Sequence, residues 1–250
     1  MNAIVQHFTA ADGTDLAWHE LGEGRPVVLL HGLFSDAFTN WLRYGHAAAI
    51  AARGFRVIMP DLRAHGESGK PHDPAFYPPD ILASDGLALI AHLGLEDYDL
   101  GGYSLGARTS VRMVALGARP KKLIVSGMGL QGLIRTGNRS GHFRKILQGL
   151  GTFERGTPEW LAEAFLKTTG GDPAALLPLL DSFVDTSEEA LAHFAMPTLV
   201  LSGDEDSDNG SPQALADLLP HADYVEVPGN HMSAVIKPDL GLVMADFLAR

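Results

Sequence analysis

Ser104 lies at the centre of Gly102-Tyr103-Ser104-Leu105-Gly106, a Gly-x-Ser-x-Gly pattern between a predicted strand and a predicted helix. A side chain in place of either glycine would collide within a strand-to-helix turn tight enough to expose the serine hydroxyl. The N-terminus of the following helix would place positive dipole beside that hydroxyl. The pattern therefore predicts that Ser104 is a nucleophile.

A serine hydroxyl is a weak nucleophile near neutral pH, so it needs a base, and the base needs an orienting carboxylate. His231 follows the predicted strand Tyr224–Val227, and Asp206 follows the predicted strand Thr198–Leu201. Ligands of open α/β sheets bind at the carboxyl ends of strands, so both positions suit a catalytic site. We expect His231 to be the base and Asp206 the acid.

The acidic run leaves two alternatives for the carboxylate. Asp206 is preferred because it lies three residues beyond Gly203 and therefore past the tight turn. Asp204 is the first alternative and Asp208 the second, while most carboxylates of such a run are ordinarily solvated.

When a serine hydroxyl attacks a carbonyl group, negative charge develops on the carbonyl oxygen. This oxyanion would need hydrogen-bond donors on the other side of the serine. His31-Gly32-Leu33-Phe34 follows the predicted strand Val27–Leu30, and glycine there lets the backbone turn its amides inward. We expect the amides of Leu33 and Leu105 to be these donors, each lowering the barrier by ~3 kcal/mol. His31 itself is interpreted as a structural hydrogen-bonding residue.

The elements that must position these residues alternate between strands and helices. A hairpin is predicted around the turn 11–15, and six apolar runs have the character of strands covered on both faces. The six runs are Val27–Leu30, Phe55–Met59, Tyr98–Leu100, Leu123–Val125, Thr198–Leu201 and Tyr224–Val227. Helical spacing of apolar residues occurs between them, at 82–93, 211–219 and 240–248. This alternation predicts an α/β fold with an eight-stranded, mostly parallel twisted sheet, helices on its faces and one antiparallel edge.

More than 70 residues separate the strands at 123–125 and 198–201, which exceeds an ordinary connection. We interpret residues 128–195 as a mainly helical insertion, here called the inserted segment, with helical pieces at Glu159–Lys167 and Glu188–Phe194. Its apolar content is too high for disorder. The core is then expected to comprise residues 1–127 and 196–250.

These motifs, in this order, resemble the α/β-hydrolase-fold superfamily over essentially the whole chain. The Asp61–Ser68 stretch also resembles that family's Asp-x-Arg-Gly-His-Gly-x-Ser turn, although Ala64 replaces a glycine, so that turn is expected to differ locally. The resemblance implies a helical cap after the sixth strand, corresponding to the inserted segment, and a Ser104–His231–Asp206 triad. Within that family, the serine at position 104 disfavours haloalkane dehalogenases and epoxide hydrolases, because both resemble this sequence but use aspartate at the corresponding position.

Three functions remain open at this point. The first is a serine hydrolase that cleaves a carboxylic ester or lactone of a small, largely apolar substrate. The second is a carbon–carbon bond hydrolase of the meta-cleavage type, and the third is a non-catalytic ligand-binding protein of the same fold. The intact set of Ser104, Asp206 and His231 favours an enzyme.

The substrate pocket is the least determined feature. Six residues are candidate pocket walls, although each is equally able to belong to the core: Phe34, Trp41, Met128, Leu130, Trp160 and Met232. A cationic group within the inserted segment is a candidate anion-binding site, or else the polar face of a helix: Arg135, Arg139, His142, Arg144 and Lys145.

Composition limits the remaining possibilities. The chain has 250 residues, no cysteine and a net charge of −11, so a thiolate nucleophile is excluded and nucleic-acid binding is disfavoured. No signal-peptide pattern and no apolar run approaching eighteen residues occur, which predicts a cytoplasmic protein without a membrane partner. We expect a small-molecule substrate, no metal and no cofactor. The oligomeric state is left open.

Overall fold

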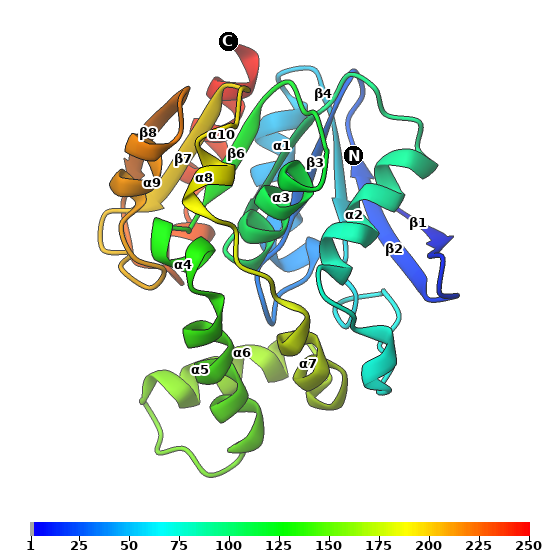
Figure 1. Cartoon of the computed structure of the whole chain (residues 1–250), viewed down its shortest axis with the longest axis vertical. Helices are drawn as coiled ribbons and strands as arrows, with labels where there is room; N and C mark the ends of the chain where they lie inside the picture. The colour runs from blue at the N-terminus through cyan, green and yellow to red at the C-terminus, as the bar shows by residue number, and fades with distance from the viewer. Residues whose placement is uncertain (1–2) are drawn as a thin grey trace.

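The computed structural model describes residues 3–250, in which eight strands form one twisted sheet of order β1-β2-β4-β3-β5-β6-β7-β8 (Figure 1). The expected core range begins at residue 1, and residues 1–2 lie outside the described part. Within residues 3–250, β2 pairs antiparallel with β1 and β4, and the other neighbouring strands pair parallel. The predicted fold class is confirmed. The strands are β1 (Ile4–Thr9), β2 (Asp15–Leu21), β3 (Arg25–Leu30), β4 (Phe55–Pro60), β5 (Asp99–Tyr103), β6 (Leu123–Ser126), β7 (Thr198–Gly203) and β8 (Ala222–Val227).

Side chains of one strand alternate between two buried apolar layers, one on each face of the sheet. Along β3, Val28 and Leu30 belong to one layer, whereas Val27 and Leu29 belong to the other. Burial on both faces explains why this strand reads in the sequence as a continuous apolar run.

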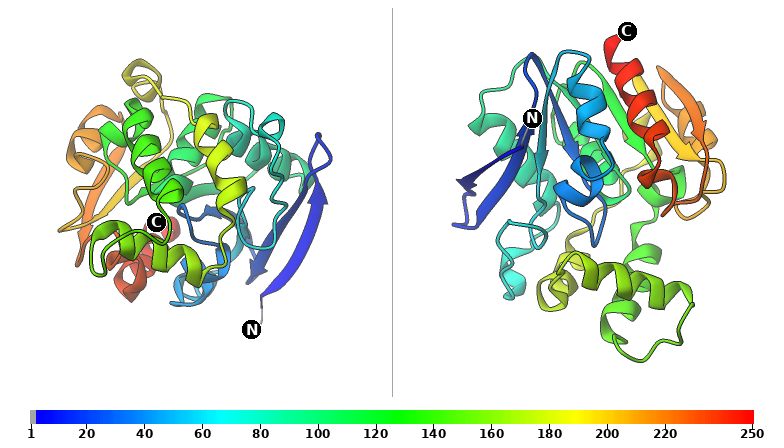
Figure 2. Two further views of the ribbon diagram at one scale, coloured as in Figure 1. Left: turned by 90° about the horizontal axis from the view of Figure 1, so that it is seen from below. Right: turned by 180° about the vertical axis from the view of Figure 1, so that it is seen from behind.

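Helices cover both faces (Figures 1 and 2). Helices α2, α3 and α9 pack on the face that includes Val28 and Leu30, while α1 and α10 pack on the opposite face. The predicted helices at 82–93, 211–219 and 240–248 correspond to α2, α9 and α10. Ser211 caps α9 as its sequence suggests, since its hydroxyl accepts a hydrogen bond from the Ala214 amide at 3.0 Å. These core helices are α1 (His46–Ala51), α2 (Ile81–His92), α3 (Leu105–Ala115), α9 (Pro212–Leu218) and α10 (Pro238–Ala249), with short turns η1 (Phe38–Leu42), η2 (Pro74–Phe76) and η4 (Ala234–Ile236).

The inserted segment is helical, and its middle helices α5, α6 and α7 lie beyond one end of the sheet (Figure 1). Its buried residues Leu176 and Leu179 belong to the same apolar cluster as Val125 of β6, so they extend the core. The predicted helix Glu188–Phe194 is shorter than expected and ends at Leu191. The helices are α4 (Leu130–Ile134), α5 (Thr136–Gln148), α6 (Pro158–Thr168), α7 (Pro173–Leu179) and α8 (Glu188–Leu191), with the turn η3 (Leu180–Ser182).

Strand register brings the ends of three strands together. Leu30 of β3 lies opposite Gly102 of β5, and Tyr103 of β5 lies opposite Ser126 of β6. The loops that follow β3 and β5 are therefore neighbours at the carboxyl edge of the sheet. Within the described residues, no helix is both long enough and apolar enough to span a membrane.

Candidate active site

Ser104 occupies a strained turn between β5 and α3. Its backbone has φ 54° and ψ −112°, a conformation that costs an L-residue about 1–3 kcal/mol and that the surrounding structure must enforce. A Cβ atom on Gly102 would overlap the backbone of Gly106, and one on Gly106 would overlap the carbonyl oxygen of Leu30. The steric requirement predicted for both glycines is confirmed.

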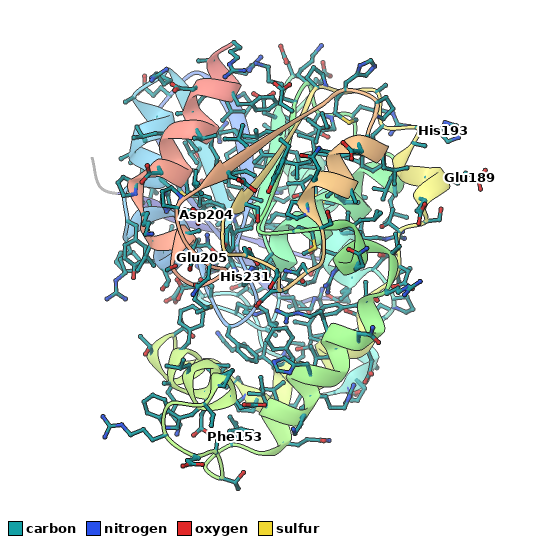
Figure 3. All side chains as sticks on the ribbon, turned by 90° about the vertical axis from the view of Figure 1, so that its left-hand side faces the viewer. Phe153, Glu189, His193, Asp204, Glu205 and His231 are labelled. Carbon is teal, nitrogen blue, oxygen red and sulfur yellow. The ribbon has the colours of Figure 1, made fainter. Side chains whose placement is uncertain are left out.

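The three residues predicted as a triad lie in one hydrogen-bonded row. The Oγ atom of Ser104 is 3.0 Å from Nε2 of His231, and Nδ1 of His231 is 2.8 Å from Oδ2 of Asp206. The side chain of Asp206 is 3% exposed, so its carboxylate is held out of water beside the imidazole. Figure 3 shows His231 at the edge of the core that faces the inserted segment. This arrangement can transfer a proton from the hydroxyl to the imidazole.

The two alternative carboxylates have other partners. Asp204 accepts a hydrogen bond at Oδ1 from the Gly229 amide at 2.7 Å, which ties the loop after β7 to the loop that carries His231. The carboxylate of Asp208 lies with Oδ2 3.4 Å from Nη2 of Arg139, and the Asp208 amide donates to Oδ1 of Asp206 at 3.1 Å, which leaves Oδ2 of Asp206 for the imidazole. The geometry therefore favours Asp206 as the carboxylate beside His231.

Tyr103 is a supporting residue that sequence reasoning missed. Its hydroxyl donates a 2.6 Å hydrogen bond to the carbonyl oxygen of His231, and the two rings lie 5.3 Å apart between centroids. Burial and the negative charges of Asp206 and Asp208 raise the pKa of Tyr103 well above its usual value, so the hydroxyl stays protonated as a donor. The one available signal was its position next to Ser104.

His31 fixes the loop on the opposite side of Ser104. Its Nε2 accepts the Leu62 amide at 2.9 Å, so Nδ1 carries the proton and donates to the Gly32 carbonyl at 2.8 Å. Burial lowers the pKa of His31, which keeps the ring neutral. The structural interpretation of His31 fits these contacts.

The Gly32 amide donates to Oδ1 of Asn40 at 3.0 Å, a contact that the sequence did not predict. No hydrogen bond from the amides of Leu33 or Leu105 is found within residues 3–250. Leu105 is the first residue of α3, so its amide has no acceptor within the helix. Neither amide is committed to another acceptor among these residues, and their role as oxyanion donors stays a prediction.

A cavity of about 340 Å³ opens beside Ser104 and His231, within the size range of small-molecule sites. Helix α6 lines it with Pro158, Leu161, Ala162 and Phe165, whose spacing of three and four residues defines one helical face. Helix α5 contributes Arg139, His142 and Phe143 with the same spacing. The cavity is mainly apolar, with charge concentrated at α5 and Asp208.

Two of the six predicted pocket residues, Phe34 and Met232, line this cavity. Phe34 has a φ of 62°, and its carbonyl accepts a 2.6 Å hydrogen bond from the Thr169 hydroxyl, which links the loop after β3 to the inserted segment.

The structure corrects the pocket prediction for the other four residues. Trp41 and Met128 are fully or almost fully buried in the core, at 0% and 1% exposure. Leu130 begins α4 and packs against the core cluster. Trp160 is on α6 but outside its cavity-facing stripe, and its ring lies 5.8 Å from the Arg155 guanidinium. Residue type alone did not reveal these orientations.

Only part of the predicted cationic group lies at the cavity. Arg139 and His142 line the cavity, whereas Arg135, Arg144 and Lys145 do not. Arg144 pairs with Asp181 at the edge of the inserted segment.

The turn after β4 supports the loop that follows β3. Asp61 accepts hydrogen bonds from the amides of Ala37 and Glu67, both at 2.8 Å. Ala64 has a φ of 69°, so it takes the left-handed backbone conformation that glycine adopts more easily. The ring of His65 packs edge-on against that of His31, with centroids 5.0 Å apart.

Buried His65 predicts a loss of stability in acid. Burial lowers the pKa of His65 to about 3, below the value of 6.5 expected in the unfolded chain. The unfolded state therefore binds a proton that the native state rejects, and stability falls as pH drops from about 6.5 towards 3, by ~1.4 kcal/mol per pH unit. His65→Asn keeps a donor for the Arg63 carbonyl and should lessen the slope by about one proton. Urea unfolding at pH 6, 5 and 4 measures both slopes, and equal slopes would contradict the assignment.

Sequence comparisons identify similar proteins. The model of the Alpha/beta hydrolase family matches residues 27–240. A non-heme haloperoxidase of Rhodococcus erythropolis is 39% identical over 112 residues, which cover 43% of this chain and 37% of that protein. A non-heme chloroperoxidase of Kitasatospora aureofaciens is 27% identical over 262 residues, covering 92% of this chain and 93% of the relative. The chain thus spans little more than a third of the first relative and nearly all of the second.

Solved structures share the fold. A hydrolase from Pseudomonas aeruginosa superposes with a TM-score of 0.80 at 22% identity, covering 98% of both chains. An esterase from Exiguobacterium antarcticum superposes with a TM-score of 0.77 at 20% identity, covering 98% of this chain and 99% of the esterase. At such identities the likeness establishes the fold and not the substrate.

Proposed function

The chain belongs to the alpha/beta hydrolase family, and on this premise we propose that it hydrolyses a carboxylic ester or lactone of a small, largely apolar substrate through an acyl-enzyme on Ser104. The supporting observation is the row of Ser104, His231 and Asp206, with contacts of 3.0 and 2.8 Å, beside a mainly apolar cavity. The 340 Å³ volume suits a small ester.

In the first half-reaction, Oγ of Ser104 attacks the ester carbonyl while Nε2 of His231 takes the hydroxyl proton. The negative charge on the carbonyl oxygen is stabilised by the amides of Leu33 and Leu105. Collapse of this intermediate breaks the bond to the alcohol oxygen, and His231 returns the proton to that oxygen. Asp206 stabilises the imidazolium that exists between these two steps.

In the second half-reaction, water attacks the acyl group on Ser104, with His231 again taking a proton. Breakdown of the second intermediate releases the carboxylic acid and restores the serine hydroxyl as His231 returns the proton. Asp204 and Tyr103 act indirectly, since they hold the backbone of the loop that carries His231.

A labelling experiment tests the proposed nucleophile. A fluorophosphonate probe should modify the protein with loss of fluoride, and peptide mapping should place the phosphonate on Ser104 alone, because the hydroxyl beside His231 is the activated one. Turnover of 4-nitrophenyl butyrate should disappear in step with labelling. Modification at another serine, or full turnover after Ser104 is modified, would contradict the proposal.

Carbon–carbon bond hydrolysis at the same serine is a second candidate. It is favoured by Arg139, a cation in the cavity that suits the dicarboxylate-like substrates of meta-cleavage hydrolases. Comparing kcat/KM for 4-nitrophenyl esters with that for ring-cleavage diketones separates the two reactions. A non-catalytic binding protein would turn over neither.

A further inference from the structure

We propose that Arg139 binds a carboxylate group on the substrate, so that the enzyme prefers esters that carry a free carboxylate over neutral esters of the same size. This inference rests on the proposed ester hydrolysis at Ser104 and names the substrate class of that site. It assigns Arg139 the role of a specificity-determining residue.

The position of Arg139 is the first reason. It lies on α5 and lines the same 340 Å³ cavity as Ser104 and His231. Among residues 3–250 it is the one arginine or lysine in the cavity lining. A ligand that reaches Ser104 therefore shares a small and mainly apolar space with one guanidinium, where a charge-assisted hydrogen bond is stronger than in water.

The second reason is that Arg139 is short of hydrogen-bond acceptors. A guanidinium has five N–H donors, but the one side-chain hydrogen bond found for Arg139 within the described residues runs from Nη2 to Oδ2 of Asp208. That contact is long, at 3.4 Å. The remaining donors are free to bind a carboxylate in the two-point geometry that guanidinium groups favour.

The two partners of the Arg139–Asp208 ion pair differ in how far water can solvate them. The side chain of Asp208 is 47% exposed and is solvated by water, whereas that of Arg139 is only 21% exposed. A second carboxylate in the cavity therefore supplies hydrogen bonds that Arg139 lacks, whereas a cationic ligand would supply Asp208 with contacts that water already provides. This difference favours an anionic substrate over a cationic one.

Neighbouring residues on α5 hold the guanidinium in place. Its central carbon lies 4.9 Å from the centroid of the Phe143 ring, one helical turn away, which restricts the plane of the group. His142 also lines the cavity, and burial together with the charge of Arg139 lowers its pKa from 6.5. Because His142 is then neutral at pH 7, the positive charge at this end of the cavity belongs to Arg139.

Matched ester pairs test the proposal. Mono-4-nitrophenyl glutarate and 4-nitrophenyl pentanoate place a carboxylate or a methyl group at the end of the same acyl chain. The pair 4-acetoxybenzoate and 4-methylphenyl acetate makes the same change on the alcohol side. For at least one pair we expect Arg139→Met to lower the anionic-to-neutral ratio of kcat/KM by about tenfold, the usual worth of a charge-assisted hydrogen bond.

Two further variants sharpen the test. Arg144→Met removes a charge from the same helix but outside the cavity, so the ratio should stay within about twofold if contact and not long-range attraction is responsible. Asp208→Asn removes the competing carboxylate and should raise the ratio several-fold. A fall in the ratio for Asp208→Asn, or equal effects of Arg139→Met and Arg144→Met, would overturn the proposal.

Binding is measured separately, so that failure of the proposed ester hydrolysis can be distinguished from failure of the carboxylate site. In Ser104→Ala, monoethyl glutarate should raise Tm more than ethyl pentanoate does, and adding Arg139→Met should abolish the difference. If no ester is hydrolysed but this shift in Tm occurs and depends on Arg139, the proposed ester hydrolysis is contradicted and the carboxylate site is supported. If neither the ratio nor the shift depends on Arg139, the carboxylate site is wrong even where neutral esters are hydrolysed.

Discussion

Ser104→Ala should lower kcat for ester hydrolysis by a factor of roughly 10⁶, because the variant loses the oxygen that forms the acyl-enzyme. The residual rate would come from substrate binding and from the amides of Leu33 and Leu105. Initial rates with 4-nitrophenyl butyrate, at enzyme concentrations high enough to detect slow turnover, measure the loss.

Ser110→Ala is the matched control. It removes a buried hydroxyl from α3, the helix that follows Ser104, but that hydroxyl donates to the Gly106 carbonyl at 2.9 Å and lies outside the cavity lining. The control should retain activity within a few-fold of the unaltered protein. The Tm of Ser104→Ala should stay close to that of the unaltered protein. Its low activity can then be assigned to the missing nucleophile and not to unfolding. If the variant keeps more than about 1% of the activity, the hydrolysis does not proceed through Ser104.

Asp206→Asn should lower kcat by about 10⁴. The carboxylate accepts the Nδ1 proton of His231 across 2.8 Å and so leaves Nε2 free to take the serine proton. An asparagine amide at this place can donate to Nδ1, which favours the tautomer whose Nε2 already carries a proton. The measurement is kcat between pH 6 and 9 with the same ester.

Asp204→Asn is the comparison that distinguishes the two acids. The amide oxygen of asparagine can still accept the Gly229 amide, so the loop that carries His231 should keep its position and activity should fall less than about tenfold. Comparable losses for the two variants would mean that this loop acts through its overall charge, and would contradict a specific role for Asp206.

Local sterics and spacing made much of the site predictable from the sequence. Gly102 and Gly106 flank Ser104 because a side chain at either place would overlap backbone. The overlap at Gly102 is with Gly106, whereas the overlap at Gly106 is with Leu30 of the neighbouring strand. The Gly-x-Ser-x-Gly pattern that signals both constraints lies within five residues of chain. The apolar runs predicted the strands for a similar reason, since burial on both faces demands apolar side chains at every position. Asp206 and His231 were predictable because each follows the carboxyl end of one of those strands.

Helix α5 illustrates what short-range reasoning did not supply. Its sequence contains two glycines and has no clear apolar stripe, so the sequence offers a helix here only as one interpretation of the cationic group and does not give its bounds. In the structure, Oδ1 of Asp185 accepts the amide and the hydroxyl of Thr136 at its first turn, both at 2.7 Å and from 49 residues away. A weak helix former is thus stabilised at its start by a residue whose proximity depends on the whole fold.

What the sequence alone determined is the scaffold and the order of its chemical groups, because the apolar pattern and the glycines around Ser104 are patterns of near neighbours in the chain. The tertiary structure decided which side chains line the cavity beside Ser104. Trp160 and Phe165 are both aromatic residues of α6, yet only Phe165 lines the cavity, because the way the helix packs sets which stripe faces Ser104. The same packing brings Arg139 into the cavity and leaves Arg144 outside it, since orientation depends on contacts between segments that are distant in the chain.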